Sequence, residues 1–492
     1  MRSARVAIVT LAAAAGCMPG VPRVGGVAIA PIAPDRTWHP PPEARVADSL
    51  GVAASVPSVL AGRAATLTLA DAVDLALRNN PATRASWAQA RAAADAYGIA
   101  RSVLVPTVSG VVSATRAAAA GGGTATGAAG GGSGARTALS SMLDLSYLVL
   151  DFGGRSGGVL ESRESAFAAS YTHNRVVQTT VLQVEQTFFA YAGARTLRDA
   201  QRASVAEAQT SYDAARKRDS VGLATITDVL QARTALAQAE LQLQAAEAQL
   251  QVTRSSLSLA LGLPPTAPFD VAASAAEVPV GEIAASVDAL IDQALRERPD
   301  LQAAHAGAAA AQAAVRVARS AALPALVLSA DEGYARSSPA SLTGRSYALS
   351  LSVQIPLVDG EAHAYSVAAA QAQADAAAAQ LAARRQAVAT DVYSAYFTLE
   401  AATQQVRTSD DLLASASAAM RAARAQYTEG LVQIVDLLTA QAALATARAQ
   451  QAQARWSWGE ALAGLGYAAG ALDTGGRAGV PVRRDTTRST SP

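Results

Sequence analysis

The chain has little of the chemistry on which most enzymes and nucleic-acid-binding proteins rely. Its 492 residues include one cysteine, four histidines and a single lysine, and only 4% are aromatic. One cysteine forms no disulfide within the chain. The formal net charge of +1 provides no basic excess for a polyanion. We therefore expect no disulfide framework and no nucleic-acid partner.

Recognisable catalytic constellations are also missing. The histidines are scattered without a His-Glu-x-x-His motif, and there is no Walker-type loop and no Gly-x-Ser-x-Gly. The Gly-rich run Ala117–Gly134 has no strand-to-helix context for phosphate, so we interpret it as a loop. Glu361 and His363 fit a solvated helix start better than a metal site. We expect that the protein is not an enzyme and that it carries no catalytic residues, no metal and no cofactor.

Long apolar runs are absent after the N-terminus, so no transmembrane helix is expected. At the N-terminus, Arg2 and Arg5 precede the apolar run Val6–Ala15, which is typical of a secretory signal. The only cysteine, Cys17, follows two alanines and a glycine, as in a bacterial lipoprotein processing site. Residues 1–17 are thus predicted to be a signal peptide ending at a lipidated, palmitate-bearing Cys17. An ordinary signal peptide with an incidental cysteine is the alternative.

What the chain does have is an internal duplication. The segment Ala76–Pro81 recurs as Ala294–Pro299, a spacing of 218 residues (294 − 76). A second set recurs at 208 residues (436 − 228): Asp151, Phe189, Gly222 and Asp228 return as Asp359, Phe397, Gly430 and Asp436. The first copy therefore carries an insertion, which contains the Gly-rich run. Low-complexity insertions are best tolerated at exposed loop tips.

The duplication predicts the domain organisation. After the signal come a Pro-rich extension (18–63), repeat 1 (64–281), repeat 2 (282–470) and a disordered C-terminal tail (471–492). Proline at high density disfavours helix in the extension. The tail is polar and ends in proline.

Each repeat is predicted to contain a first helix, a β-hairpin and a pair of longer helices. The first helices are expected at Leu67–Ser102 and Ala285–Ala322, and the long helices at Gly157–Arg218 and Ala364–Tyr427. A helix of that length needs partners along its whole length, as in a coiled coil. Returning helices are expected at Thr225–Leu261 and Ile434–Leu465. A returning helix and the next repeat's first helix together match one long helix in length, so the two are expected to stack end to end against it. This arrangement predicts an irregular belt at mid-length.

The hairpins are predicted at 103–150 and 324–358, where the apolar period changes from helical to alternating. Apolar Leu351 and Val353, for example, alternate with Ser350 and Ser352. Strands of about ten residues match a membrane-crossing barrel strand. A half-buried strand of a soluble sandwich shows the same alternation.

Four such strands leave open edges, which are costly in a membrane. We therefore expect several chains to close one barrel, and three chains would give twelve strands. The polar side chains would line its lumen; the candidates are Asp144, Ser146, Ser350, Ser352 and Gln354.

The chain resembles the outer-membrane efflux (TolC-like) family of Gram-negative bacteria over residues 66–470, as a lipoprotein-type member. The motifs are Leu67–Ala72, Arg101 to Pro106 with its copy Arg319 to Pro324, Pro356–Gly360, and Gly222–Leu230 at a helix tip. The resemblance implies an α+β membrane protein: a trimeric, twelve-stranded outer-membrane β-barrel continued by a long periplasmic α-helical barrel.

It further implies a lipid-anchored channel of a tripartite efflux or secretion system, of the kind linked to multidrug resistance. Such a channel passively conducts drugs, small molecules or proteins outward. The implied partners are a homotrimer, a periplasmic adaptor, an inner-membrane pump and outer-membrane lipid. A non-conducting helical envelope scaffold lipoprotein is the alternative.

The resemblance places a periplasmic gate at the helix tips, with Thr227 and Asp228 at the first tip and Tyr427 and Asp436 at the second. Family aspartates there form a ring, which would favour cations, and Tyr427 would bond to Asp228 across neighbouring helix pairs. Thr225 and Asp228 also match a helix-capping motif, which would explain Asp228 by itself.

Two positions depart from the family's gate pattern. Val432 stands where some members carry a gating arginine, and Thr439 stands where some carry a second aspartate. We therefore expect a weaker latch and a less charged ring.

Overall fold

The computed structural model describes residues 23–24, 27–28, 67–117, 136–272, 281–283, 285–338, 344–472 and 482–484. The chain forms two units, Met1–Ser58 and Val59–Pro492. The described part of the first unit is an antiparallel pair of two-residue strands, β1 (Arg23–Val24) and β2 (Val27–Ala28). Cys17 and the Gly-rich run after position 117 lie outside the described residues.

The second unit contains the same order of elements twice. The first copy comprises α3 (Leu69–Asn79), α4 (Pro81–Ser102), β3 (Thr107–Ala117), β4 (Arg136–Leu150), α5 (Gly154–Ser220) and α6 (Ile226–Ala260). The second comprises α7 (Val287–Glu297), α8 (Pro299–Ser320), β6 (Ala325–Ser338), β7 (Gly344–Gln354), α9 (Ala362–Thr428) and α10 (Ile434–Ala468). No helix among the described residues combines the length and the apolar character that a membrane span requires.

The prediction of one continuous first helix in each repeat is wrong. Asn80 separates α3 from α4, and Arg298 separates α7 from α8; both have extended backbone. Each precedes a proline, and proline sterically disfavours the helical conformation of the preceding residue. Proline is well suited to the first turn of the next helix. The side chain of Asn80 caps that helix by accepting a hydrogen bond of 2.8 Å from Ala82 N.

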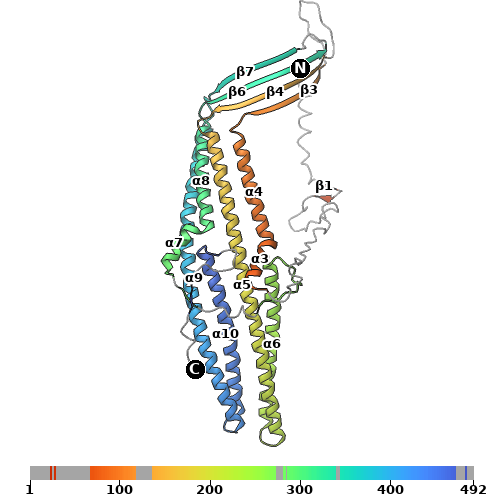
Figure 1. Cartoon of the computed structure of the whole chain (residues 1–492), viewed down its shortest axis with the longest axis vertical. Helices are drawn as coiled ribbons and strands as arrows, with labels where there is room; N and C mark the ends of the chain where they lie inside the picture. Colours follow the sequence, from red (N-terminus) through yellow and green to blue (C-terminus); the bar gives the residue numbers. More distant parts are fainter. Residues whose placement is uncertain are drawn as a thin grey trace, which may run out of the picture. The chain divides into compact units, whose positions relative to one another are not determined.

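The two hairpins form one antiparallel sheet of order β3-β4-β6-β7. The sheet lies at one end of the long helices (Figure 1). Strands β4 and β6 join the repeats at its centre. Strands β3 and β7 form the two edges, each with one side unpaired among the described strands.

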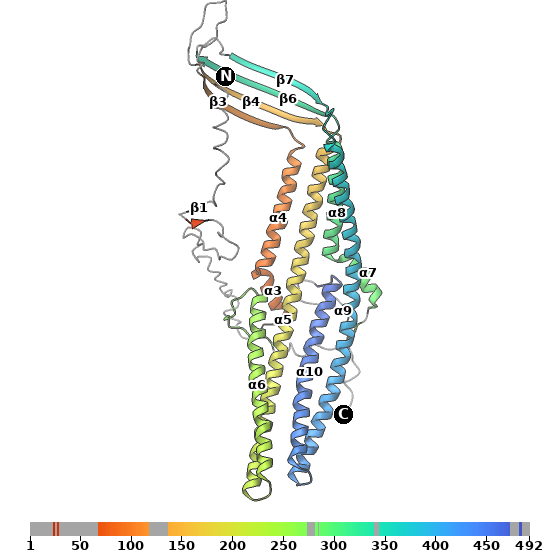
Figure 2. The ribbon, with the colours of Figure 1, turned by 180° about the vertical axis from the view of Figure 1, so that it is seen from behind.

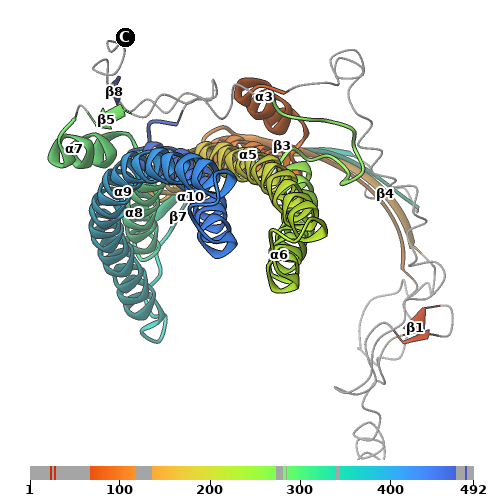
Figure 3. The same ribbon diagram turned by 90° about the horizontal axis from the view of Figure 1, so that it is seen from below.

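The long helices α5 and α9 carry the shorter ones along their length. Helices α4 and α6 pack on α5, and α8 and α10 pack on α9 (Figure 2). The end of α6 meets the first helices of its own repeat, where Asn80 bonds to the Ala260 carbonyl. The predicted stacking on the next repeat's first helix is therefore wrong. Helices α8 and α10 also contact α5, which joins the repeats. Seen from below, α3 and α7 lie on the same side of the wall that α5, α6, α9 and α10 form (Figure 3).

Two glycines allow α5 and α10 to pack closely. A Cβ atom on Gly193 would lie 2.9 Å from Trp456 Cβ, and one on Gly459 would lie 2.8 Å from the ring of Phe189. Each helix thus inserts an aromatic side chain over a glycine of the other. A side chain at either glycine would displace α5 from α10.

The belt at mid-length contains a short β-pair. Strand β5 (Gly281–Ile283) pairs with β8 (Val482–Arg484), and Leu67 bridges to Val271. Strand β8 belongs to the tail that was predicted to be disordered, so for these three residues the prediction is wrong. The backbone of β5 supplies hydrogen-bond partners that sequence patterns do not reveal.

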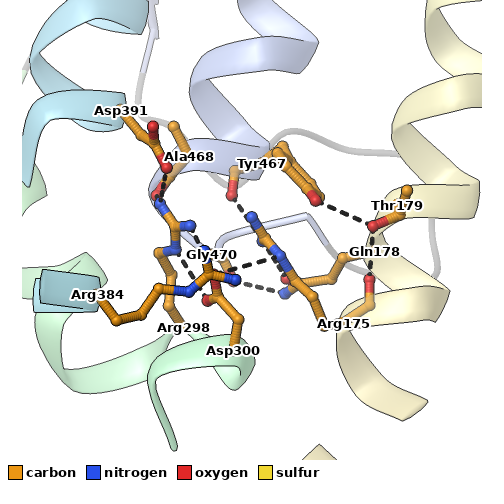
Figure 4. Close-up of polar contacts among 10 residues, drawn as sticks. All are labelled: Arg175, Gln178, Thr179, Arg298, Asp300, Arg384, Asp391, Tyr467, Ala468 and Gly470. Carbon is orange, nitrogen blue, oxygen red and sulfur yellow. Dashed lines mark hydrogen bonds and ion pairs between the residues drawn. The ribbon is translucent and has the colours of Figure 1, made fainter. Parts of the chain in front are cut away.

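A buried ionic network fixes the second repeat at this belt (Figure 4). Arg298, only 2% exposed, donates to both oxygens of Asp300 at 3.0 and 2.7 Å and to Asp391 at 3.0 Å. Arg175 and Arg384 approach Asp300 at 3.8 and 3.3 Å. The network links α5, α8 and α9. The guanidinium of Arg298 also reaches the carbonyl of the last residue of α10 at 3.3 Å.

The charges around Asp300 control its protonation. Burial would raise the pKa of Asp300, but hydrogen bonds from Arg298 and the charges of the three arginines outweigh burial, and the pKa falls below its usual value. A lowered folded-state pKa stabilises the fold above the pKa of an unfolded aspartate. That contribution is lost only as the pH falls through the folded-state pKa. Asp300 therefore stays ionised at neutral and mildly acidic pH.

We predict that Asp300→Asn lowers the free energy of unfolding by about 3 kcal/mol or more, because it removes the main counter-charge of the buried Arg298. The matched control is Asp74→Asn, whose partner Arg78 is 75% exposed and whose loss should cost less than about 1 kcal/mol. Denaturant unfolding followed by circular dichroism measures both. Equal losses in the two variants would show that the network does not hold the belt.

Candidate functional site

The predicted lumen residues share one face of the sheet. Asp144 and Ser146 lie on β4, and Ser350 lies in the same row as Ser146, with Ser329 between them. The hydroxyls of Ser329 and Ser350 are 2.8 Å apart. Ser352 and Gln354 follow at alternate positions of β7. One polar row thus runs across all four strands on this face, as Thr107, Ser146, Ser329 and Ser350.

One acidic residue of this face was missed by the sequence analysis. Asp331 on β6 stands directly opposite Asp144 in the register. The two carboxylates are cross-strand neighbours, so they add negative charge at the same height of the wall. The alternation of β6 predicts this position, because apolar Leu326, Leu328 and Ala330 put Asp331 on the polar face.

The opposite face of the sheet is apolar and uncovered. Leu349, Leu351 and Val353 of β7 are 74%, 64% and 60% exposed. Side chains of this size are normally withdrawn from water. A contiguous apolar face of this kind marks a surface that lipid or another macromolecule covers.

The two helix tips have the same construction. Gly222 turns α5 into α6, and Gly430 turns α9 into α10, at φ of 75° and 76°. Such positive φ values favour glycine. The first tip exposes Thr227, in the first turn of α6.

Both predicted gate aspartates cap helices within the chain. Asp228 accepts hydrogen bonds from Thr225 N at 2.9 Å and from Thr225 Oγ1 at 3.0 Å. Asp436 accepts one from Gln433 N at 3.2 Å. The predicted capping role of Asp228 is thus confirmed. Helix capping leaves room for a second role, so a place for these aspartates in a ring stays a prediction.

Tyr427 is buried at the junction of the tips, at 8% exposure, in a cluster with Ala215, Val229 and Ile434. Val432, at the position of a gating arginine in some family members, packs against this same cluster. The second tip is therefore held largely by apolar contact.

The polar partner of Tyr427 is a residue that the sequence analysis missed. Arg218 Nη1 donates to the Tyr427 carbonyl oxygen at 2.7 Å, and its guanidinium lies 4.7 Å from the centre of the Tyr427 ring. This contact ties the end of α5 to the end of α9. A cation in the last turn of a helix ordinarily signals only the helix dipole, so the sequence gives no sign of the contact. The bond from Tyr427 to Asp228 between neighbouring helix pairs stays a prediction.

A second polar contact joins α5 and α10 farther from the tips. Arg448 of α10 forms a double hydrogen bond to Glu207 of α5, at 3.0 and 3.2 Å. Gln441 of α10 also bonds to the hydroxyl of Ser211. The tips of one chain are thus fixed to each other at more than one level. Among the described residues, no group of three or more His, Cys, Asp or Glu side chains is arranged to hold a metal ion.

The sequence of the chain is similar to those of known bacterial proteins. The chain is 30% identical over 386 residues to Protein CyaE of Bordetella pertussis, covering 77% of this chain and 79% of CyaE. It is 26% identical over 262 residues to the antibiotic efflux pump outer membrane protein ArpC of Pseudomonas putida, covering 53% of each.

Solved structures share the fold. The open state of the Neisseria gonorrhoeae MtrE outer membrane channel matches with a TM-score of 0.72 at 19% identity, over 82% of this chain and 88% of that one. The outer membrane protein VceC of Vibrio cholerae matches with a TM-score of 0.71 at 19% identity, over 82% and 96%. The fold class predicted from the sequence is confirmed.

The profile of the family described as outer membrane efflux protein matches residues 72–263 and 290–471, which are the two repeats. The polar and apolar faces of the sheet, the paired helix tips and this match agree. The chain belongs to the outer membrane efflux protein family.

Proposed function

We propose that this protein is the outer-membrane channel of a tripartite efflux or secretion system. Three copies close one twelve-stranded barrel, and the long helices continue it as a periplasmic duct. A periplasmic adaptor and an inner-membrane pump deliver drugs, small molecules or proteins, and the channel conducts them passively to the exterior.

One observation carries this proposal: the four-stranded sheet has an apolar face, a polar face and two edges that no other described strand pairs with. An apolar outer surface suits lipid, and a polar inner surface suits a water-filled pore. A helical scaffold lipoprotein without conduction would have no use for the polar row of Ser146, Ser329 and Ser350. The channel is therefore the better explanation.

Lipidation of Cys17 would add an anchor at the outer membrane. This proposal is supported by the charged and apolar segments before Cys17 in the sequence. Mass spectrometry of the mature N-terminal peptide should find an acylated Cys17. A mature chain that begins elsewhere, or an unmodified Cys17, would refute the anchor.

The gate is proposed to lie at the helix tips. Thr227 and Asp228 of the first tip and Asp436 of the second would line the entrance, while Tyr427 and Arg218 hold the tips together. Three copies of each aspartate would form a negative constriction and favour cations over anions.

Purified protein should produce discrete single-channel currents in planar lipid bilayers, because the polar face of the closed barrel is wet. The matched preparation is heat-denatured protein in the same detergent, which should produce none. A folded protein that inserts into the bilayer without carrying current would favour the scaffold and exclude the channel.

Asp436→Asn should reduce the cation selectivity of that current, measured as the reversal potential across a salt gradient. Asparagine keeps an acceptor for Gln433 N but removes the charge, so helix capping is largely retained. The matched control is Asp375→Asn, which removes an exposed charge from mid-helix α9. A reversal potential identical to that of the unmodified protein would remove Asp436 from the constriction.

A further inference from the structure

Near the loops of the β-hairpins, charged side chains replace the apolar ones on the apolar face of the sheet. There it carries three exposed arginines: Arg116 on β3, Arg336 on β6 and Arg345 on β7. The register places all three on the face of Leu139 and Leu143, since Arg336 stands opposite Leu139. They lie near the hairpin-loop ends of β3, β6 and β7, and these strand ends are remote from the long helices (Figure 2).

These arginines have no polar partner among the residues that the structure describes. No ion pair or hydrogen bond engages their side chains among the described residues, whereas the belt arginines each have partners. The only carboxylate on this face of the described strands is Glu332. Three cations against one anion give each chain an excess of positive charge at this level.

Two tyrosines mark the same level. Tyr334 is 46% exposed and stands opposite Arg345, and Tyr347 is 87% exposed and stands opposite Glu332. Tyrosines at the end of an apolar band are typical of the boundary between hydrocarbon and head groups. In the proposed channel, the arginines would therefore lie at the depth of the lipid head groups.

A hollow of about 420 Å³ lies beside them. Gly110 and Ser141 leave space in the surface, and the hollow is bounded by Leu143, Tyr334 and Arg345. Glu332 and Arg345 line it together with apolar groups such as Val112 and Leu143. The apolar part suits a hydrocarbon chain, and Arg345 lies beside it for the head group.

We propose that this surface binds a lipid with a phosphorylated, anionic head group in the outer leaflet. Arg116, Arg336 and Arg345 contact the phosphates, and one acyl chain occupies the hollow. The planar guanidinium binds phosphate in a bidentate manner, and basic clusters at a membrane surface favour anionic lipid. The proposal rests on the lipid-facing orientation of this face in the proposed channel.

The test uses the full protein in phosphatidylcholine nanodiscs that contain a small fraction of diphosphoryl lipid A. Native mass spectrometry then counts the lipid A molecules that the protein retains after release into detergent. The R116Q/R336Q/R345Q variant should retain at least about tenfold less lipid A than the unmodified protein, since each arginine contributes to the attraction.

The control variant R233Q/R421Q/R424Q removes three exposed arginines from the helices and should retain lipid A normally. Equal retention by the sheet variant overturns the proposal. An equal loss in the control variant also overturns it, because binding would then follow net charge alone.

Single-channel recording of the same proteins separates this proposal from the channel itself. The sheet variant should conduct with unchanged ion selectivity, because its substitutions face lipid. A changed selectivity would place the arginines in the lumen and overturn the lipid site. Unmodified protein that retains lipid A specifically but carries no current would support the lipid site and refute the channel.

Discussion

The unpaired edges of the four-stranded sheet are the constraint on which the rest of the structure depends. Strands β3 and β7 each present a row of backbone N–H and C=O groups without a strand partner in the described chain. In hydrocarbon each such group costs several kcal/mol (about 2–7). A single chain cannot satisfy both rows, so other copies must. Closure then gives the apolar face to lipid and the polar face to a shared lumen.

Close-packed and polar contacts hold the long helices together along their length. The Gly193 and Gly459 contacts hold α5 against α10, and the Arg298–Asp300 network holds α8 against α9 and α10. The two repeats use equivalent positions differently. Arg298 reaches the carbonyl of Ala468 from a charged network, whereas Asn80 reaches that of Ala260 at 3.4 Å through a neutral amide. At these equivalent positions the contact is thus ionic in the second repeat and neutral in the first.

Features set by local pattern were predictable from the sequence. Alternation located the strands and their polar faces at Ser350 and Ser352, because side chains alternate across a strand. The helix breaks at Asn80 and Arg298 were also marked in the sequence by the prolines that follow them. The sequence analysis nevertheless took each first helix as continuous. The contact of Arg218 with Tyr427 joins residues 209 positions apart. It depends on how α5 packs against α9, and no local sequence pattern encodes that packing.

Hydrogen exchange of the backbone amides in membrane-inserted protein tests the central claim most directly. If copies of the chain complete one barrel, the amides of the edge strands β3 and β7 should exchange as slowly as those of the central strands β4 and β6. Fast exchange in alternate amides of β3 and β7, with protection confined to β4 and β6, would show that the edges remain open and would contradict the closed barrel.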